Sequence, residues 1–160
     1  MKVVVNSTPL IALSLVDKLS LLKEIFSEVI VPKSVFEEVA VLGKGRPGSE
    51  EVKAAMWLTL SEPQDRGPLP PSLLGLDAGE MDVILLAKEV GADYVIIDER
   101  LGRRVAKSLG LKVKGTLGIL LAAYQSGLIA REEAEKVVEE LANSFIRVSP
   151  FLVKWFRSQL

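Results

Sequence analysis

Short apolar runs rich in β-branched residues alternate along this chain with longer segments of helical periodicity, and this alternation restricts the fold more than any other feature. Runs of this kind are typical of strands that are buried on both faces of a sheet. Because helical segments separate the runs, the chain is predicted to form a mostly parallel sheet covered by helices on both faces. The predicted strands are residues 2–5, 28–31, 57–60, 94–97, 111–113 and 145–148.

The segments between the predicted strands carry helix signals. After the first strand, Ser7 or Thr8 can cap a helix and Pro9 suits its first turn, and leucines with helical spacing follow. Further helices are predicted to open at residue 32 and to span residues 49–56, 76–90, 99–109, 116–126, 131–143 and 150–158. Residues 62–72, rich in proline and glycine, are predicted to be a long surface loop. The halves beside this loop are too small to fold alone, so residues 1–160 are predicted to form one domain.

The chain contains neither cysteine nor histidine. The absence of cysteine excludes disulfides, thiolate zinc sites and cysteine nucleophiles. The absence of histidine excludes Ser-His-Asp triads, imidazole bases and histidine-ligated metals. Acid–base or metal chemistry must therefore use Asp, Glu, Lys, Tyr or water, and carboxylate-rich sites suit Mg²⁺ and Mn²⁺.

The overall charge of the chain is close to balanced, at −1. A pure nucleic-acid-binding module usually shows a basic excess, whereas an acidic catalytic site lowers the net charge of a nuclease. The first residues lack the charged and apolar regions of a signal peptide. No apolar run reaches the roughly 18–20 residues that span a membrane, so the expectation is a cytoplasmic protein without membrane contact.

Polar side chains stand where the predicted strands end. In open α/β sheets, ligands bind beyond the carboxyl ends of the strands. Asn6 ends the first strand, and Asp98 ends the strand at residues 94–97. Glu38 lies in the helix after the second strand, and Glu80 lies near the start of a later helix. Carboxylates gathered at one edge repel each other unless a cation neutralises them, so the pattern predicts a divalent-metal site.

Each of these residues also has an ordinary structural interpretation. Asp77 is best explained as a helix cap, and Asp98 can cap the helix that follows it. Asn6 can be a turn residue that hydrogen-bonds its own backbone. Glu37 and Glu38 point about 100° apart on a helix, so only one of the two is expected in a site.

A basic stripe follows Asp98. It is formed by Arg100, Arg103, Arg104 and Lys107, whose spacing places them on one helix face. Such a stripe suits contacts with a phosphate backbone. An ordinary solvated face, partly paired with acids such as Glu89 or Glu99, explains the pattern equally well.

Four stretches carry, in their order and spacing, a resemblance that covers nearly the whole chain. They read VVVNSTPLIALSLVDKLSLLKEIF, VIVPKSVFEEV, LDAGEMDVILLAKEVGADYVIIDERLGRRVAKSLGL and VKGTLGILLAAYQSGLI. Together they resemble the PIN-domain superfamily, and within it a prokaryotic, nucleic-acid-binding PIN-like family. The resemblance implies a three-layer α/β/α domain and a metal-dependent ribonuclease that hydrolyses phosphodiester bonds, such as the toxin of a toxin–antitoxin pair.

The resemblance also implies roles for single residues. The metal ligands of the family fall on Asn6, Glu38, Glu80 and Asp98, of which the three acids are the expected catalytic residues. They would hold Mg²⁺ or Mn²⁺, with help from Asp82 or Glu99, and a metal-bound water would attack the phosphodiester. Thr116 matches a common sequence of the family, with an expected structural role. The implied partners are RNA, an antitoxin-like protein and a second copy of the chain in a homodimer.

One departure from the family keeps an alternative open. The family has an aspartate where Asn6 stands, and an amide brings no charge to a metal. The alternative is therefore a catalytically weak or inactive PIN-like module that binds nucleic acid or protein. An apolar C-terminal segment, with Phe151, Leu152, Trp155 and Phe156, either buries in a partner or packs on its own domain. A phosphatase-like hydrolase is disfavoured because it would need an aspartate nucleophile at residue 6.

Overall fold

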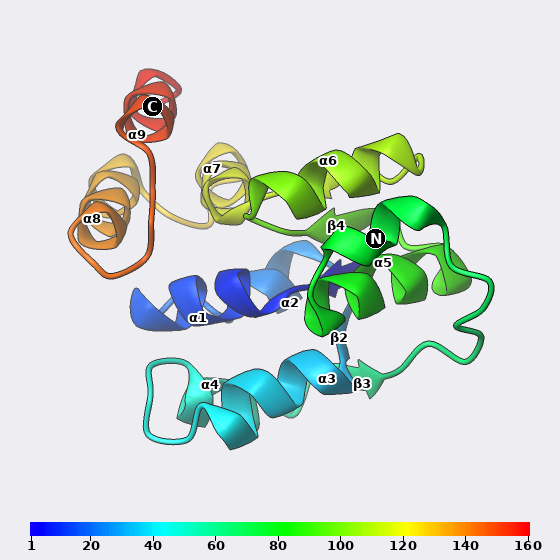
Figure 1. Cartoon of the computed structure of the whole chain (residues 1–160). Coiled ribbons are helices and arrows are strands. Elements are labelled where there is room, and N and C mark those ends of the chain that lie inside the picture. The colour runs from blue at the N-terminus through cyan, green and yellow to red at the C-terminus, as the bar shows by residue number, and fades with distance from the viewer.

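The computed structural model describes residues 1–160 and centres on a five-stranded sheet in which all neighbouring strands run parallel (Figure 1). The strands are β1 (Lys2–Val5), β2 (Glu28–Pro32), β3 (Thr59–Ser61), β4 (Tyr94–Ile96) and β5 (Val113–Lys114). Their spatial order is β3-β2-β1-β4-β5. The predicted α/β class with a parallel sheet is confirmed.

The strand order reverses between β1 and β4. These strands are distant in the sequence but pair directly, with Val4 opposite Val95. Val3 to Val5 of β1 and Val95 and Ile96 of β4 are inaccessible to solvent, because β1 and β4 lie inside the sheet and are covered on both faces. A reversal of this kind opens a crevice beyond the carboxyl ends of the two strands, where ligands of α/β proteins usually bind.

Helices cover both faces of the sheet. They are α1 (Ser7–Leu15), α2 (Leu21–Ile25), α3 (Lys33–Phe36), η1 (Glu37–Leu42), α4 (Ser49–Ala54), η2 (Pro71–Gly75), α5 (Ala78–Val90), α6 (Arg100–Ser108), α7 (Thr116–Gln125), α8 (Arg131–Ala142) and α9 (Pro150–Ser158). Helix α5 packs across β1, β2 and β4, while α1, α2 and α7 pack together in the other layer. Helices α8 and α9 continue outward from α7 (Figure 1). None of these helices is both long and apolar enough to cross a membrane.

Four predicted elements differ from the structure. The strand predicted at residues 111–113 is shifted to Val113–Lys114, where it pairs with β4. The leucine-rich helix is interrupted, because Asp17 adopts a left-handed φ of 58° and separates α1 from α2. The strand predicted at residues 57–60 is displaced to Thr59–Ser61 at the sheet edge. The strand predicted at residues 145–148 is wrong. That segment crosses from α8 to α9, and its alternating apolar residues pack on the core without pairing to a strand.

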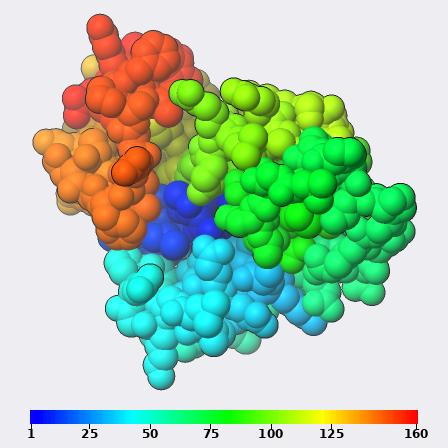
Figure 2. All heavy atoms as spheres, in the orientation of Figure 1, coloured from blue at the N-terminus to red at the C-terminus, as the bar shows by residue number.

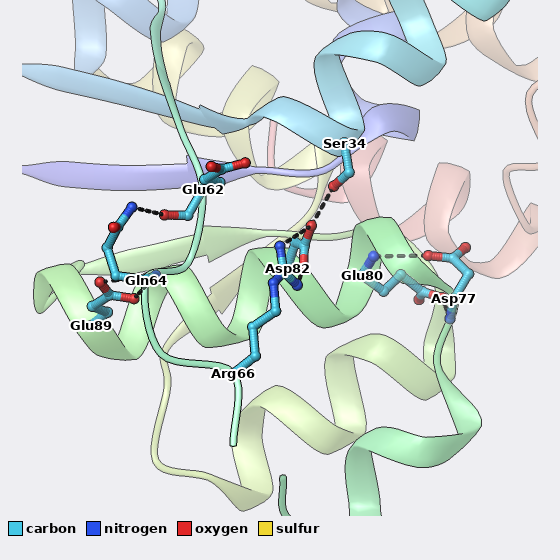
Figure 3. Close-up of polar contacts among 8 residues, drawn as sticks. All are labelled: Ser34, Glu62, Gln64, Arg66, Asp77, Glu80, Asp82 and Glu89. Atoms are coloured by element: carbon cyan, nitrogen blue, oxygen red, sulfur yellow. Dashed lines mark hydrogen bonds and ion pairs between the residues drawn. The ribbon is translucent and has the colours of Figure 1, made fainter. Parts of the chain in front are cut away.

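The proline- and glycine-rich loop at residues 62–72 is fastened to α5. The Arg66 guanidinium forms an ion pair with the Asp82 carboxylate, which also accepts a 2.6 Å hydrogen bond from the Ser34 hydroxyl. Further along α5, Glu89 accepts a 3.0 Å hydrogen bond from the Gln64 backbone N–H (Figure 3). Asp82 was predicted to assist at the metal site. Its side chain is only 6% exposed, and its carboxylate is instead bound by Arg66 and Ser34.

Replacing Arg66 with alanine is expected to lower the free energy of unfolding by about 1–2 kcal/mol. The Asp82 carboxylate would stay buried with only Ser34 as a partner, and the exposure of the arginine limits the loss. Urea unfolding measures this difference. Arg104→Ala, which removes an arginine without an ion pair, is the control and should change the value by less than about 0.5 kcal/mol. Equal stability of both variants would contradict the role assigned to the ion pair.

Candidate active site

The crevice beyond β1 and β4 brings together segments that are far apart in the sequence. The backbone N–H of Asn6 donates a 3.0 Å hydrogen bond to the Ile96 carbonyl, so the ends of the two strands are tied side by side. In Figure 2, blue atoms of the segment after β1 are visible at the bottom of a depression between cyan, green and orange segments. The segment that follows β1 therefore reaches the surface on this face.

Glu99 is the residue on which the crevice contacts converge. Its carboxylate accepts a 2.6 Å hydrogen bond from the Thr8 hydroxyl and a 3.3 Å hydrogen bond from the Asn6 amide. Asn6 is only 2% exposed, and its hydrogen bond to the half-buried Glu99 is partly buried. An aspartate at residue 6 would face Glu99 with a like charge, whereas the amide donates to it. The asparagine is therefore matched to Glu99 when no cation is bound.

Glu80 carries the clearest electrostatic signature. It closes a capping box at the start of α5, where its backbone N–H donates a 2.8 Å hydrogen bond to the Asp77 carboxylate (Figure 3). This confirms Asp77 as a helix cap. Burial raises the pKa of Glu80 to about 7, and the negative charges of Asp77 and Glu99 act in the same direction. Glu80 is therefore half-protonated near neutral pH.

Two of the predicted acids lie next to glycines, and one of these glycines makes room for its neighbour. A Cβ atom on Gly102 of α6 would lie 2.6 Å from one carboxylate oxygen of Glu80. A Cβ on Gly79 would lie 3.5 Å from a carboxylate oxygen of Glu38. Glu38 sits exposed on η1, a π-helical turn of the type often found at functional sites. These close approaches place the Glu38 carboxylate at the start of α5 and the Glu80 carboxylate against α6.

Asp98 is held in a fixed orientation by Thr116. One carboxylate oxygen accepts a 2.8 Å hydrogen bond from the Thr116 backbone N–H, and the other accepts a 2.6 Å hydrogen bond from its hydroxyl. Burial raises the pKa of Asp98 against these hydrogen bonds, and Glu99 raises it while Arg103 lowers it. The negative charge of Glu99 therefore raises the pKa of both Glu80 and Asp98. The predicted structural role of Thr116 agrees with these contacts.

The donor chemistry of the crevice fits a divalent cation. Every side chain that could bind a metal here does so through oxygen, as Mg²⁺ and Mn²⁺ prefer. The space that Gly102 leaves beside Glu80, and the raised pKa of that carboxylate, indicate negative charge that a cation would neutralise. No three acidic side chains stand together as a ready-made cage, so the carboxylates would have to turn inward to bind.

The structure thus joins the predicted residues in two groups. Asn6 and Glu80 are linked to Glu99, through a hydrogen bond and through charge, while Asp98 is bound to Thr116. Sequence reasoning gave Glu99 only a helping role, although it follows Asp98 directly at the end of β4. The sequence signal was its place beyond an apolar strand, but adjacency to Asp98 did not show which carboxylate faces Asn6.

The basic stripe behaves as its spacing predicts. Its four residues lie on one face of α6 and line a cavity of about 390 Å³ together with Asp98 and Leu152. None of the four forms an ion pair, so Glu89 and Glu99 do not neutralise them. Arg103 also donates a 2.9 Å hydrogen bond to the Ile97 carbonyl, which fixes its side chain beside Asp98.

Asn6→Asp is expected to lower the free energy of unfolding by about 1–3 kcal/mol in the presence of a chelator, because it replaces a donor to Glu99 with a like charge. The same change is expected to tighten Mn²⁺ binding about tenfold. Thermal unfolding and titration calorimetry measure the two effects. Asn143→Asp, at an exposed residue, is the control. Unchanged stability together with unchanged Mn²⁺ affinity would show that residue 6 does not face the site.

Comparison with known proteins identifies the family and a similar solved structure. A family model described as a PIN domain matches residues 2–160. A solved PilT N-terminus domain protein from the hyperthermophilic archaeon Sulfolobus solfataricus P2 superposes with a TM-score of 0.55 and is 16% identical. The superposition covers 78% of this chain and 95% of that one, and at this identity it speaks for the fold alone. Comparison with curated proteins finds no match.

Proposed function

The chain belongs to the PIN domain family, whose members are generally nucleases dependent on divalent metals, and we propose that it is itself a metal-dependent endoribonuclease. The observation that carries the proposal is Glu80, a carboxylate with a pKa of about 7 in the crevice where the strand order reverses. Negative charge concentrated at that place is what a cation-binding hydrolytic site requires.

The proposed ligands are Glu38, Glu80, Asp98 and the amide oxygen of Asn6, to which the contacts of the crevice add Glu99. When bound, Mg²⁺ or Mn²⁺ would activate water and neutralise charge on the phosphate. Glu99 holds Asn6 and Thr8 in place, and the capping box fixes the Glu80 backbone. Each oxygen of Asp98 keeps a free lone pair beside its bond from Thr116, so Thr116 orients the carboxylate without blocking it.

The direct test is cleavage of a labelled single-stranded RNA by the purified protein. Cleavage is expected with Mn²⁺ or Mg²⁺, is expected to stop when the ions are chelated, and is expected to return when they are restored. A matched single-stranded DNA distinguishes RNA from DNA as substrate. Cleavage that persists in excess chelator would contradict the proposal, since the chain has no histidine to support a metal-free ribonuclease mechanism.

A second candidate is a binding module with little or no cleavage. It is favoured by the Asn6–Glu99 hydrogen bond, because the amide removes one negative charge and already satisfies a prospective ligand. Under this alternative, the protein binds RNA without cutting it, and Asn6→Asp creates activity. Under the leading proposal, the unaltered protein already cleaves RNA.

The toxin role, the antitoxin-like partner, the homodimer and the cytoplasmic location stay predictions from the resemblance and the composition. Growth arrest on expression, relieved by Glu80→Gln, tests the toxin role. Light scattering at micromolar concentration tests the dimer, and a strict monomer would contradict it.

A further inference from the structure

A second cavity lies between the body of the domain and its C-terminal helix, and Asp98 is the one proposed metal ligand that borders it. Its volume is about 490 Å³, within the range of small-molecule sites. The start of α7 forms one wall, and α9 with the segment before it forms the other. Figure 2 shows the hollow between the orange-red C-terminal segment and the yellow-green α6.

The wall contributed by α9 is aromatic and exposed. Phe151 is 76% exposed and Trp155 is 39% exposed, and both line the cavity. In contrast, Phe156 on the same helix is fully buried and anchors α9 on the domain. The predicted packing of the apolar tail on its own domain therefore holds for Phe156, while Phe151 and Trp155 present aromatic surface that the protein itself leaves uncovered.

Positive charge surrounds this aromatic wall. Arg103 and Arg147 line the cavity, and Asp98 is the only acid that does so. Lys114 also lines the cavity, and its ammonium lies 5.0 Å from the centre of the Tyr94 ring. The cavity shares Asp98, Arg103 and Leu152 with the cavity along the basic stripe. The two therefore form one groove, which we call the α6–α9 groove, with unpaired cations at one end and aromatic rings at the other.

We propose that the α6–α9 groove binds single-stranded nucleic acid, with an unstacked base against Trp155 and Phe151 and the backbone phosphates along the α6 stripe. A base offers a flat face for stacking, and its phosphate offers a negative charge to Arg103 and Arg147, neither of which forms an ion pair in the protein. This inference rests on the proposed function only in taking RNA as the natural ligand, since the groove borders the proposed site at Asp98 alone and its aromatic end lies away from Glu80 and Glu99.

The shape of the groove selects a single strand. A base inside a duplex is stacked and paired on all sides, so it cannot enter a cavity, whereas a base in a single strand can turn out and stack on an aromatic ring. The one-sided charge favours nucleic acid over an apolar peptide, which would leave the arginines and the α6 cations unpaired.

The fluorescence emission of Trp155 can report binding in the groove. The chain has two tryptophans, and Trp57 lies elsewhere, beside Lys23. In a Trp57→Phe protein, all tryptophan emission comes from Trp155, and it is recorded during titration with a short oligouridylate in excess chelator, so that no cleavage occurs. The matched protein is Trp155→Phe, which keeps only Trp57. Single-stranded RNA is expected to quench the Trp155 emission, a duplex of the same length is not, and Trp57 emission is expected to stay unchanged.

Substitutions in the groove test the assignment further. Phe151→Ala is expected to weaken binding of the oligouridylate about tenfold through lost stacking. Arg147→Ala is expected to weaken it several-fold and to lower the slope of its salt dependence by about one. Arg157→Ala, an exposed arginine of α9 that does not line the cavity, is the control and is expected to bind normally.

The outcomes separate this inference from the nuclease proposal. Quenching by single-stranded RNA in a protein that never cleaves RNA would uphold the groove and overturn the proposed function. RNA cleavage without any quenching of Trp155 would overturn the groove and leave the proposed function standing. Emission of Trp155 that shifts with protein concentration alone would mean that a second copy of the chain covers the groove, which also overturns the inference.

Discussion

Glu80→Gln is expected to lower RNA cleavage by about 100-fold or more, and at the same time to make the protein more stable above pH 7. The loss of activity follows from removing a charged oxygen ligand from the proposed metal site. The gain in stability follows from removing a carboxylate that burial and the charges of Asp77 and Glu99 keep from ionising at its usual pH. Glutamine keeps the carbonyl oxygen that the capping box uses.

The pH dependence of this effect has a definite sign. Between the ordinary pKa of 4.5 and the folded value of about 7, the folded protein holds the Glu80 proton more tightly than the unfolded chain does. The free energy of unfolding therefore falls as pH rises through this window, and the full cost is present above it. Glutamine has no proton to lose, so the advantage of Glu80→Gln over the wild type is absent near pH 4 and complete near pH 8.

Thermal unfolding of Glu80→Gln and of the wild type near pH 4 and near pH 8, with chelator present, measures the difference in stability. A cleavage assay with Mn²⁺ measures the loss of activity. Glu37→Gln is the matched control, because Glu37 is an exposed neighbour of Glu38 and should change neither quantity. A Glu80→Gln protein that cleaves RNA normally would remove Glu80 from the site. A Glu80→Gln protein that is no more stable than the wild type at pH 8 would show that burial and the neighbouring charges do not destabilise the ionised Glu80 carboxylate.

Asp98→Ala is expected to lower the free energy of unfolding by about 2–4 kcal/mol. It would leave both the backbone N–H and the hydroxyl of Thr116 without their acceptor at the start of α7. Thr116→Val removes one of the two hydrogen bonds and is expected to cost about 1–2 kcal/mol. Urea unfolding compares the variants with Asp65→Ala, an exposed loop carboxylate that should change stability by less than about 0.5 kcal/mol.

The same variants separate the two roles of Asp98. If Asp98 binds the metal, Asp98→Asn loses Mn²⁺ affinity and cleavage far beyond what Thr116→Val loses, because valine leaves the carboxylate in place. If Asp98 only anchors α7, the two variants reduce cleavage to a similar extent and leave Mn²⁺ affinity unchanged. Calorimetry with Mn²⁺ on folded protein at low temperature reads the difference independently of stability.

The positions of the inner strands and of α9 could be predicted from the sequence because local chemistry decides them. Runs such as Lys2–Val5 are apolar on both faces, and Ser149 caps α9 ahead of Pro150. The interruption at Asp17 is a left-handed conformation of one residue, and the π-helical turn at Glu37–Leu42 packs against α1 and α4. The helical spacing of apolar residues predicts neither of these two backbone features.

The candidate site was predictable in its residue types but not in its contacts. Strand-end reasoning found Asn6 and Asp98, because parallel strands expose their carboxyl ends at one edge. Which acid faces Asn6 depends on how the chain leaves β4, and the structure assigns that contact to Glu99. Asp82 was wrongly expected to assist in the site for a similar reason. Its partner Arg66 lies in a loop, and no local sequence pattern predicts the path of that loop.

The pairing of β1 with β4 has a consequence for the order in which the protein becomes functional during synthesis. A nascent chain that has emerged only as far as Val90 contains β1, β2, β3 and α5, but lacks the strand beside β1 that brings in Glu99. Its proposed ligands Asn6, Glu38 and Glu80 would stand without Asp98 and Glu99, the other two proposed ligands, and Asn6 would lack its hydrogen bond to Glu99. Non-local strand pairing of this kind forms late in folding. A ribonuclease built in this way would stay inert towards the messenger RNA from which it is being translated until its second half has left the ribosome.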